Sequence, residues 1–231
     1  MEEQQFNKRF YLVIDFEANC SKENTRDHEI IEFPAVLVDA RTGSQLAEFR
    51  EFVHTIKTGP VSEFITQLTG ITTTLLKSEA VRWSTCLTLF DAWCEHHGIN
   101  ANTTTIVTCG DWDLKTMLPR QLSITQTQPT QRVMNLFGCW NNVKVTHRNA
   151  HRYKRSMGMA RILEDMKIEL TGRHHSGIDD CRNIAKICHA LSIRKGCDMT
   201  RPNRLLEVTC WFLPRPIYRR SKNGKIIKNL I

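Results

Sequence analysis

Four carboxylates and one histidine, placed in three short segments, are the residues of this chain best suited to chemistry. They are Asp15 and Glu17, then Asp113, then His175 and Asp180. Acids beside apolar strand residues are costly to bury unless something compensates their charge. Two divalent cations would balance the four carboxylates, and a site that holds two such ions attacks phosphodiester bonds.

Asp15 and Glu17 follow the apolar run Tyr-Leu-Val-Ile and are two residues apart. Side chains at this spacing point to the same face of a strand. They are therefore able to share one cation, and Asp15 is placed to bridge two. The alternative is a strand end at the surface with two solvated acids, which the apolar run disfavours because such runs are typical of central strands.

Asp111 and Asp113 flank Trp112 directly after a short β-branched run. We expect one of these acids to be a metal ligand and at least one to cap the helix that follows. The indole of Trp112 either packs in the core or stacks on a nucleic-acid base. Both alternatives stand, because aromatic stacking platforms tolerate many sequences.

His175 lies five residues before Asp180, on a glycine-containing loop that leads into a helix. Near two cations its pKa is expected to fall, so that the neutral imidazole accepts a proton from water. The alternative is a loop histidine with a structural hydrogen bond. The adjacent His174 offers the same chemistry, and the spacing to Asp180 favours His175.

The elements that position these residues follow from hydrophobic periodicity. Strands are expected at 10–16, 30–38, 46–54 and 104–108, and helices at 61–68, 72–76, 82–97, 114–118, 159–166 and 180–194. Between 119 and 156 the periodicity is weak, and only a polar loop at 123–130 stands out. This order predicts an α/β fold, a mixed sheet with helices on both faces.

The bulk composition sets the class of protein. The chain has 231 residues, 41% of them hydrophobic, which suits one domain with extensions. It contains no apolar stretch of membrane-spanning length, and its start lacks a signal-peptide pattern. Nine cysteines without a regular framework indicate reduced thiols. We therefore expect a protein that is not secreted and acts in the cytoplasm, the nucleus or both.

A net charge of +8 predicts a polyanionic partner, nucleic acid or an anionic membrane surface; a solvated basic surface is the alternative. The basic residues concentrate at 144–155 and 215–228. Such segments would hold a nucleic-acid backbone. For 215–228, a disordered tail or a nuclear targeting signal is an equal alternative.

The motifs together resemble a known family. Asp-Phe-Glu at 15–17, Trp-Asp at 112–113 and His-x-x-x-x-Asp at 175–180 are similar to the three motifs of the DEDDh 3′→5′ exonucleases, the DnaQ-like branch of the ribonuclease H-like superfamily. Segments 28–34, 68–71 and 172–180 resemble the subgroup of histone-mRNA 3′-end and enhanced-RNAi exoribonucleases, and 107–115 its prion-protein-interacting branch. The resemblance covers roughly 11–196 and implies a ribonuclease H-like mixed sheet flanked by helices.

The resemblance also implies roles for individual residues. The four carboxylates would hold two Mg²⁺ ions, or Mn²⁺, with Asp15 bridging both, and His175 would be the general base. Asp111 and Asp179 would be caps or outer neighbours. Products would be nucleoside 5′-monophosphates. The residues implied to contact the terminal nucleotide are Ala18, Thr69, Gly70 and Ile71. Trp112 is a further substrate-binding candidate, because its indole could stack on a base.

Asn19 departs from the threonine common in the subgroup, which affects a contact near the terminal sugar rather than the metal site. The implied substrate is RNA with a single-stranded 3′ end. The alternatives are a DNA-directed or dual-specificity exonuclease, and a non-catalytic RNA-binding module. The expected organisation is an extension (1–9), an exonuclease domain (10–200) and a basic tail (201–231). A structural zinc site is a weaker idea, because its candidates have helical spacing: Cys86, Cys94, His96 and His97.

Overall fold

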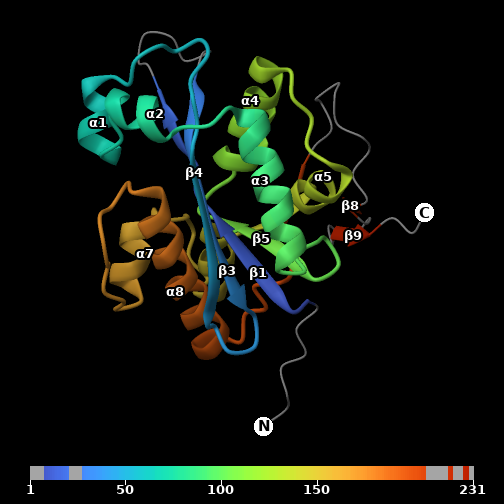
Figure 1. The fold of residues 1–231 in the computed structure, drawn as a ribbon. Helices are drawn as coiled ribbons and strands as arrows, with labels where there is room; N and C mark the ends of the chain where they lie inside the picture. The colour runs from blue at the N-terminus through green and yellow to red at the C-terminus, as the bar shows by residue number, and fades with distance from the viewer. Residues whose placement is uncertain (1–7, 21–27, 207–217, 221–225, 229–231) are drawn as a thin grey trace.

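A computed structural model of the protein describes residues 8–20, 28–206, 218–220 and 226–228. Figure 1 shows a central sheet with helices on both sides. The strands are β1 (Phe10–Ile14), β2 (Glu17–Asn19), β3 (Glu29–Asp39), β4 (Gln45–Phe52), β5 (Thr104–Thr108), β6 (Cys139–Asn142), β7 (Arg204–Leu205), β8 (Tyr218–Arg220) and β9 (Ile226–Lys228). The helices are α1 (Glu63–Thr69), α2 (Thr73–Glu79), α3 (Trp83–His96), the π-helical η1 (Trp112–Met117), α4 (Leu118–Thr125), α5 (Gln131–Phe137), α6 (Val143–Ala150), α7 (Met159–Asp165) and α8 (Gly177–Lys195).

The main sheet is mixed, as the sequence predicts. β1 pairs antiparallel with β3 and parallel with β5, and β5 pairs parallel with β6. β3 also pairs with β2 and β4, and β6 pairs with β7. Because β1 and β5 are parallel, their carboxyl ends meet at one edge of the sheet, where both acidic segments begin.

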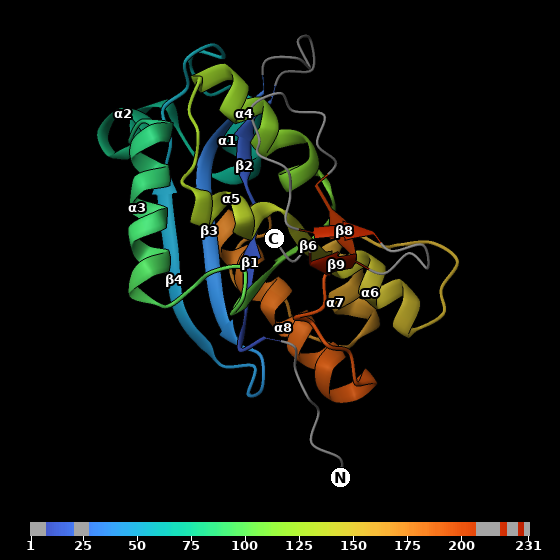
Figure 2. The ribbon, with the colours of Figure 1, turned by 90° about the vertical axis from the view of Figure 1, so that its right-hand side faces the viewer.

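The alternation along β1 divides the core into two layers. Leu12 and Ile14 face α3, α4 and α5, in a layer rich in aromatic rings such as Phe33 and Phe90. Tyr11 and Val13 face the other way, against α7 and α8. Figure 2 shows α3 and α8 on opposite sides of the sheet. A strand buried on both faces reads as a continuous apolar run, which is why the sequence predicts β1 as a central strand.

The predicted strands and helices outside 119–156 are confirmed, with shifted ends. The helix expected at 114–118 is longer, because η1 continues into α4. Leu118 N–H bonds to the carbonyl of Asp113, five residues back, and Pro119 follows without an N–H of its own. The helix expected to begin at 180 begins earlier, because α8 already starts at Gly177.

The sequence does not predict β2, α5, β6 or α6. Among the described residues no helix combines the length and apolar character needed to cross a membrane. Eight cysteines within the described parts of the chain are free thiols, as expected. Most of the basic segment 215–228 lies outside the described residues.

Candidate active site

The first two acidic segments converge at the carboxyl ends of β1 and β5. Asp15 follows β1, Glu17 opens β2, and Asp113 lies in the first turn of η1 after β5. The backbone N–H of Phe16 donates to Asp113 Oδ1 at 3.0 Å, which joins the two segments directly. The predicted proximity of Asp15, Glu17 and Asp113 therefore follows from parallel pairing of their strands.

The third segment reaches this edge through close packing of helix α8. A Cβ placed on Gly177 would lie 2.8 Å from Pro34 Cγ and 3.0 Å from the Asp15 carbonyl oxygen, so glycine allows the helix to begin against β1 and β3. Asp180 follows in the first turn. One carboxylate oxygen from each of Asp15, Glu17 and Asp180 lies within 4.8 Å of the others.

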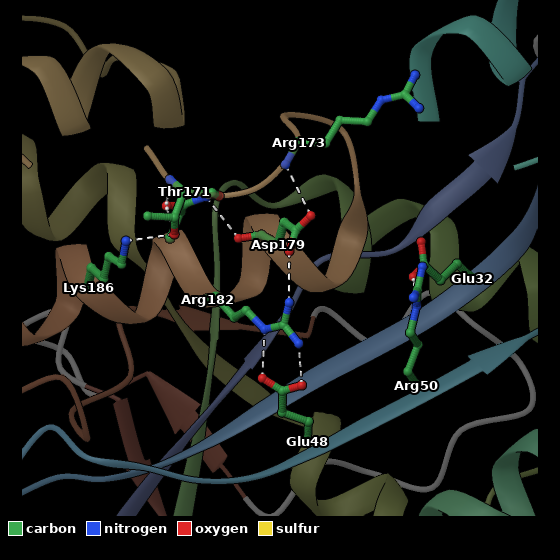
Figure 3. A network of polar contacts seen from close by, with 9 residues as sticks. Glu32, Glu48, Arg50, Thr171, Arg173, Asp179, Arg182 and Lys186 are labelled. Carbon is green, nitrogen blue, oxygen red and sulfur yellow. Dashed lines mark hydrogen bonds and ion pairs between the residues drawn. The ribbon is translucent and has the colours of Figure 1, made fainter. Parts of the chain in front are cut away.

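Ion pairs hold the start of α8 in place. Arg182 donates to both carboxylate oxygens of Glu48 on β4, at 2.8 and 2.7 Å, and to Asp179 at 2.8 Å. Asp179 also accepts the backbone N–H of Arg173. Figure 3 shows this network, together with the separate pair between Glu32 and Arg50. The acid next to Asp180 is therefore structural, as expected of an outer neighbour.

Burial disfavours the charged forms of the carboxylates in the cluster and raises their pKa values. Burial, joined by the charges of Asp113 and Glu17, holds the pKa of Asp15 well above its ordinary value. Burial and then Glu32 raise the pKa of Glu17 to about 9. Burial also raises the pKa values of Asp113 and Asp180 to about 6. Groups perturbed in this way mark functional sites more often than structural ones.

Little in the described chain neutralises these four acids. None of them forms an ion pair there, and Lys144 on α6 only partly opposes the rise in the pKa of Asp15. Asp180 Oδ1 is buried without a hydrogen-bond partner. A cluster of carboxylates without an ion-pair partner suits a hard divalent cation. The residues present therefore fit the metal that the sequence predicts.

The structure brings both candidate histidines to the cluster. His175 has a left-handed backbone (φ 66°), and its N–H donates to Asp180 Oδ2 at 2.9 Å. Its ring stacks on that of His174 with centroids 3.9 Å apart, and a ligating nitrogen of each lies within 4.8 Å of a carboxylate oxygen of Asp180. Burial, then the neighbouring His174 and Arg173, lower the pKa of His175. These distances alone do not show which of the two imidazoles is the better candidate for the general base.

A cavity of about 380 Å³ opens beside the cluster. Asp15 and Asp180 form its floor with the two histidines, and Lys144 and Arg161 contribute basic groups. Sequence reasoning assigned no individual role to His174, Lys144 or Arg161. The basic segment 144–155 was a signal for Lys144, but nothing in the pattern placed Arg161 at this site.

The residues expected near a terminal nucleotide differ in exposure. Ala18, Thr69 and Ile71 are buried, and Gly70 ends α1 with φ 83°. These residues do not line the cavity. Trp112 has 39% of its surface exposed, so the alternative that its indole packs in the core is wrong.

Arg173 connects the last turn of α1 to the segment that carries the histidines. Its guanidinium donates to the backbone carbonyl of Gln67 at 2.5 Å and to that of Leu68 at 3.4 Å. A Cβ on Gly70 would collide with the same guanidinium. Arg173 therefore fixes the distance between 69–71 and the loop that carries His175.

Two other expectations need correction. Asp111 makes no capping hydrogen bond; its carboxylate instead accepts from Trp140 Nε1, Asn142 Nδ2 and Arg204 Nε, because β7 pairs with β6 and brings Arg204 opposite Trp140. The structural zinc site is wrong as well. Its two cysteines, Cys86 and Cys94, are buried in the aromatic core layer and belong to no metal-type cluster within the described residues.

A mixed sheet with carboxylates at adjoining strand ends and a histidine loop beside them is typical of the ribonuclease H-like fold class. A family model described as Exonuclease matches residues 12–188. The chain belongs to this exonuclease family.

Individual relatives agree with this family. Human ERI1 exoribonuclease 3 is 35% identical over 187 residues, which cover 80% of this chain and 54% of that protein. The 3′-5′ exonuclease Snipper of Drosophila melanogaster is 28% identical over 217 residues, covering 87% and 72%. The nuclease domain of 3′hExo, described as a DEDDh family member bound to rAMP, superposes with a TM-score of 0.77 at 27% identity, covering 86% of this chain and 98% of that one. The chain thus spans about half the length of ERI1 exoribonuclease 3.

Proposed function

We propose that the protein is a metal-dependent 3′→5′ exoribonuclease that releases nucleoside 5′-monophosphates from single-stranded RNA 3′ ends. The observation that carries this proposal is the cluster of four carboxylates, three of them buried and Asp15 half-buried, none of which has an ion-pair partner in the described parts of the chain. Asp15 and Asp180 line a cavity with basic groups on its wall. The names of ERI1 exoribonuclease 3 and Snipper support RNA as the substrate and the 3′ end as the point of attack.

Asp15, Glu17, Asp113 and Asp180 would hold the metal, with Asp15 shared between two ions. We propose Mg²⁺ as the ion, with Mn²⁺ able to replace it, because both prefer carboxylate ligands. When bound, such ions lower the pKa of water and stabilise the charge on a leaving oxygen. The raised pKa values of the carboxylates fit this role, since a cation would favour their ionised forms.

His175 is the proposed general base. Its backbone bond to Asp180 holds the imidazole at the edge of the carboxylate cluster. Its lowered pKa keeps the ring neutral near pH 7, the form that accepts a proton from water. Lys144 and Arg161, on the cavity wall, are positioned to bind the phosphate backbone.

The terminal nucleotide is proposed to contact the backbone at Ala18 and the loop Thr69, Gly70 and Ile71. Arg173 acts as a positioning residue, because it ties this loop to the histidine segment. The exposed indole of Trp112 offers a stacking surface for a base.

The exonuclease domain is proposed to span 10–206 rather than 10–200, because β7 pairs with β6 in the main sheet. An extension at 1–9 and a basic tail at 207–231 complete the proposed organisation. A reducing compartment, cytoplasmic or nuclear, fits the free thiols.

The test is degradation of 5′-labelled single-stranded RNA and DNA of matched sequence, with Mg²⁺ or Mn²⁺. Wild type should shorten RNA progressively from the 3′ end, and Asp15→Ala should lose at least about 100-fold in rate. Asp39→Asn is the control, since Asp39 pairs with the opposite end of β1 and should keep full activity. Equal or faster loss of DNA would replace the exoribonuclease with a DNA-directed or dual exonuclease. No metal-dependent cleavage of either would favour an RNA-binding module.

A paired substitution separates the two histidines. His175→Ala should lower the turnover rate much more than His174→Ala, while Mg²⁺ binding measured by calorimetry stays close to wild type in both. A larger loss in His174→Ala would transfer the general-base role to His174.

A further inference from the structure

Two histidines and an aspartate gather on the face of α6 and α7, outside the carboxylate cluster. His147 and His151 lie four residues apart on and just after α6, so their rings share one side of the helix. Asp165 is the last residue of α7. We propose that His147, His151 and Asp165 form a second metal site, which binds a zinc-type divalent transition-metal ion.

The three ligand atoms are already close together. One nitrogen from each histidine and one oxygen of Asp165 lie within 4.8 Å of one another. His147 Nε2 is 3.0 Å from Asp165 Oδ2, and the two imidazole centroids are 4.4 Å apart. Zinc bonds of about 2.0–2.2 Å to nitrogen and oxygen therefore require only small movements of these side chains.

Outer contacts orient two of the three ligands. His151 Nδ1 is 3.1 Å from the carbonyl oxygen of His147, which makes it the protonated nitrogen and leaves Nε2 with its lone pair. The Tyr153 hydroxyl donates to Asp165 Oδ1 at 2.9 Å, which leaves Oδ2 toward the histidines. Contacts of this kind fix the tautomer and the ring orientation at metal sites.

Protonation also fits metal binding. His147 is fully buried, and its Nδ1 has no hydrogen-bond partner. Burial lowers the pKa of His147, which favours the neutral imidazole that binds metals. Although burial opposes it, hydrogen bonds from Tyr153 and His147 hold the pKa of Asp165 below its ordinary value, so this ligand is ionised. The alternative to a metal site is a simple hydrogen bond between His147 and Asp165. That bond would explain the contact between these two residues, but not why a ring nitrogen of His151 lies beside them.

The ligand types select the ion. Two imidazoles with one carboxylate suit zinc, whereas the all-carboxylate cluster at Asp15 suits magnesium. Three protein ligands leave one tetrahedral position, which water can occupy because the Asp165 side chain is 24% exposed.

The position of the site gives it a structural role. It joins the end of α6 to the end of α7, and the segment between them leads to Gly158 and Arg161 on the wall of the active-site cavity. A metal bound here would fix that wall without contacting substrate. The proposal therefore does not depend on the exoribonuclease assignment.

The experiment is a zinc titration of the chelator-treated 231-residue chain in excess Mg²⁺, the ion that we propose for the carboxylate cluster. Zinc bound per chain is measured by elemental analysis after gel filtration, and melting temperature is followed in parallel. Wild type should bind one more zinc than His151→Ala and should gain thermal stability that this variant does not gain. Co²⁺ in place of zinc should give a tetrahedral visible spectrum in wild type only.

Control variants make the result specific. Tyr153→Phe keeps all three ligands and should weaken zinc binding by roughly 10–100-fold. His96→Ala, an exposed histidine on α3, should bind zinc as wild type does. His174→Ala tests the other histidine cluster. If zinc is lost in His174→Ala and retained in His151→Ala, or if all variants bind alike, the proposal is wrong.

Discussion

At the scale of single residues, the carboxylate cluster opposes folding. Asp15 is surrounded by Asp113, Glu17 and Asp180, and its raised pKa shows that its ionised form is disfavoured in the folded protein. A group held in this way contributes function at the expense of stability. Asp179, one residue from Asp180, has the opposite environment: although burial opposes it, hydrogen bonds to Arg173 and Arg182 lower its pKa.

This contrast predicts opposite effects of two identical substitutions. In a chelator at pH 7.5, Asp15→Asn should raise stability by about 1–2 kcal/mol, a rise of a few degrees in Tm, because one of the clustered charges is removed. Asp179→Asn should lower Tm, because favourable hydrogen bonds are weakened. Adding Mg²⁺ should then stabilise wild type more than Asp15→Asn. Calorimetry measures the Tm of both variants. A lower Tm for Asp15→Asn without metal would show that the charge of Asp15 is already compensated in the wild type.

At the scale of elements, strand ends and one helix start place the site. The sequence was sufficient for β1 and β5, because strands buried on both faces have apolar runs and the acids follow them directly. It was also sufficient to group the four carboxylates. It misplaced the start of α8, because Ser176 and Gly177 have a composition typical of loops, and the close approach of Gly177 to β3 is visible only in three dimensions.

Segment 119–156 was not predictable, for a different reason. Its buried positions carry polar side chains whose partners are distant in sequence. Gln121 accepts the backbone N–H of Ile30, and Asn141 donates to the carbonyl of Arg201. Such residues break the apolar period that sequence reasoning relies on. The same limit hid α6, whose buried His147 has its partner on α7.

The packing at the start of α8 leads to the second prediction. Gly177→Ala should destabilise the protein by about 1–3 kcal/mol, because its Cβ would contact Pro34, the Asp15 carbonyl and Glu32. It should also lower nuclease activity at least about tenfold, since the helix must shift and carries Asp180 with it. Gly158→Ala is the control: its Cβ meets no atom within 4 Å, and the stability cost should stay below about 1 kcal/mol. Equal effects of the two variants on Tm would contradict the packing account.

At the scale of the whole molecule, charge is divided between two functions. The sheet edge that carries the proposed catalytic carboxylates is acidic, yet the net charge of the chain is +8. Six of its 32 lysines and arginines, and only one of its 24 acids, follow residue 206. Acidic side chains repel a polyanion, so basic groups elsewhere must supply the attraction for the RNA substrate that we propose. The cavity offers Lys144 and Arg161 for this purpose, and the tail offers a longer basic segment.

This division predicts that the tail sets much of the salt dependence of RNA binding. In an Asp15→Ala background that does not cleave, replacing Arg219, Arg220 and Lys222 with glutamine should make the slope of log K against log salt shallower by up to about 2, at about 0.7 for each phosphate that the chain no longer neutralises. A control variant neutralises three exposed basic residues elsewhere, Arg41, Lys77 and Lys195. Its slope should change by less than about 0.5, since basic side chains away from the RNA release few counterions. Fluorescence anisotropy with a labelled single-stranded RNA measures the slopes of the tail variant and of the control variant. If the two slopes are equal, the tail does not contact the substrate and its charge serves another partner.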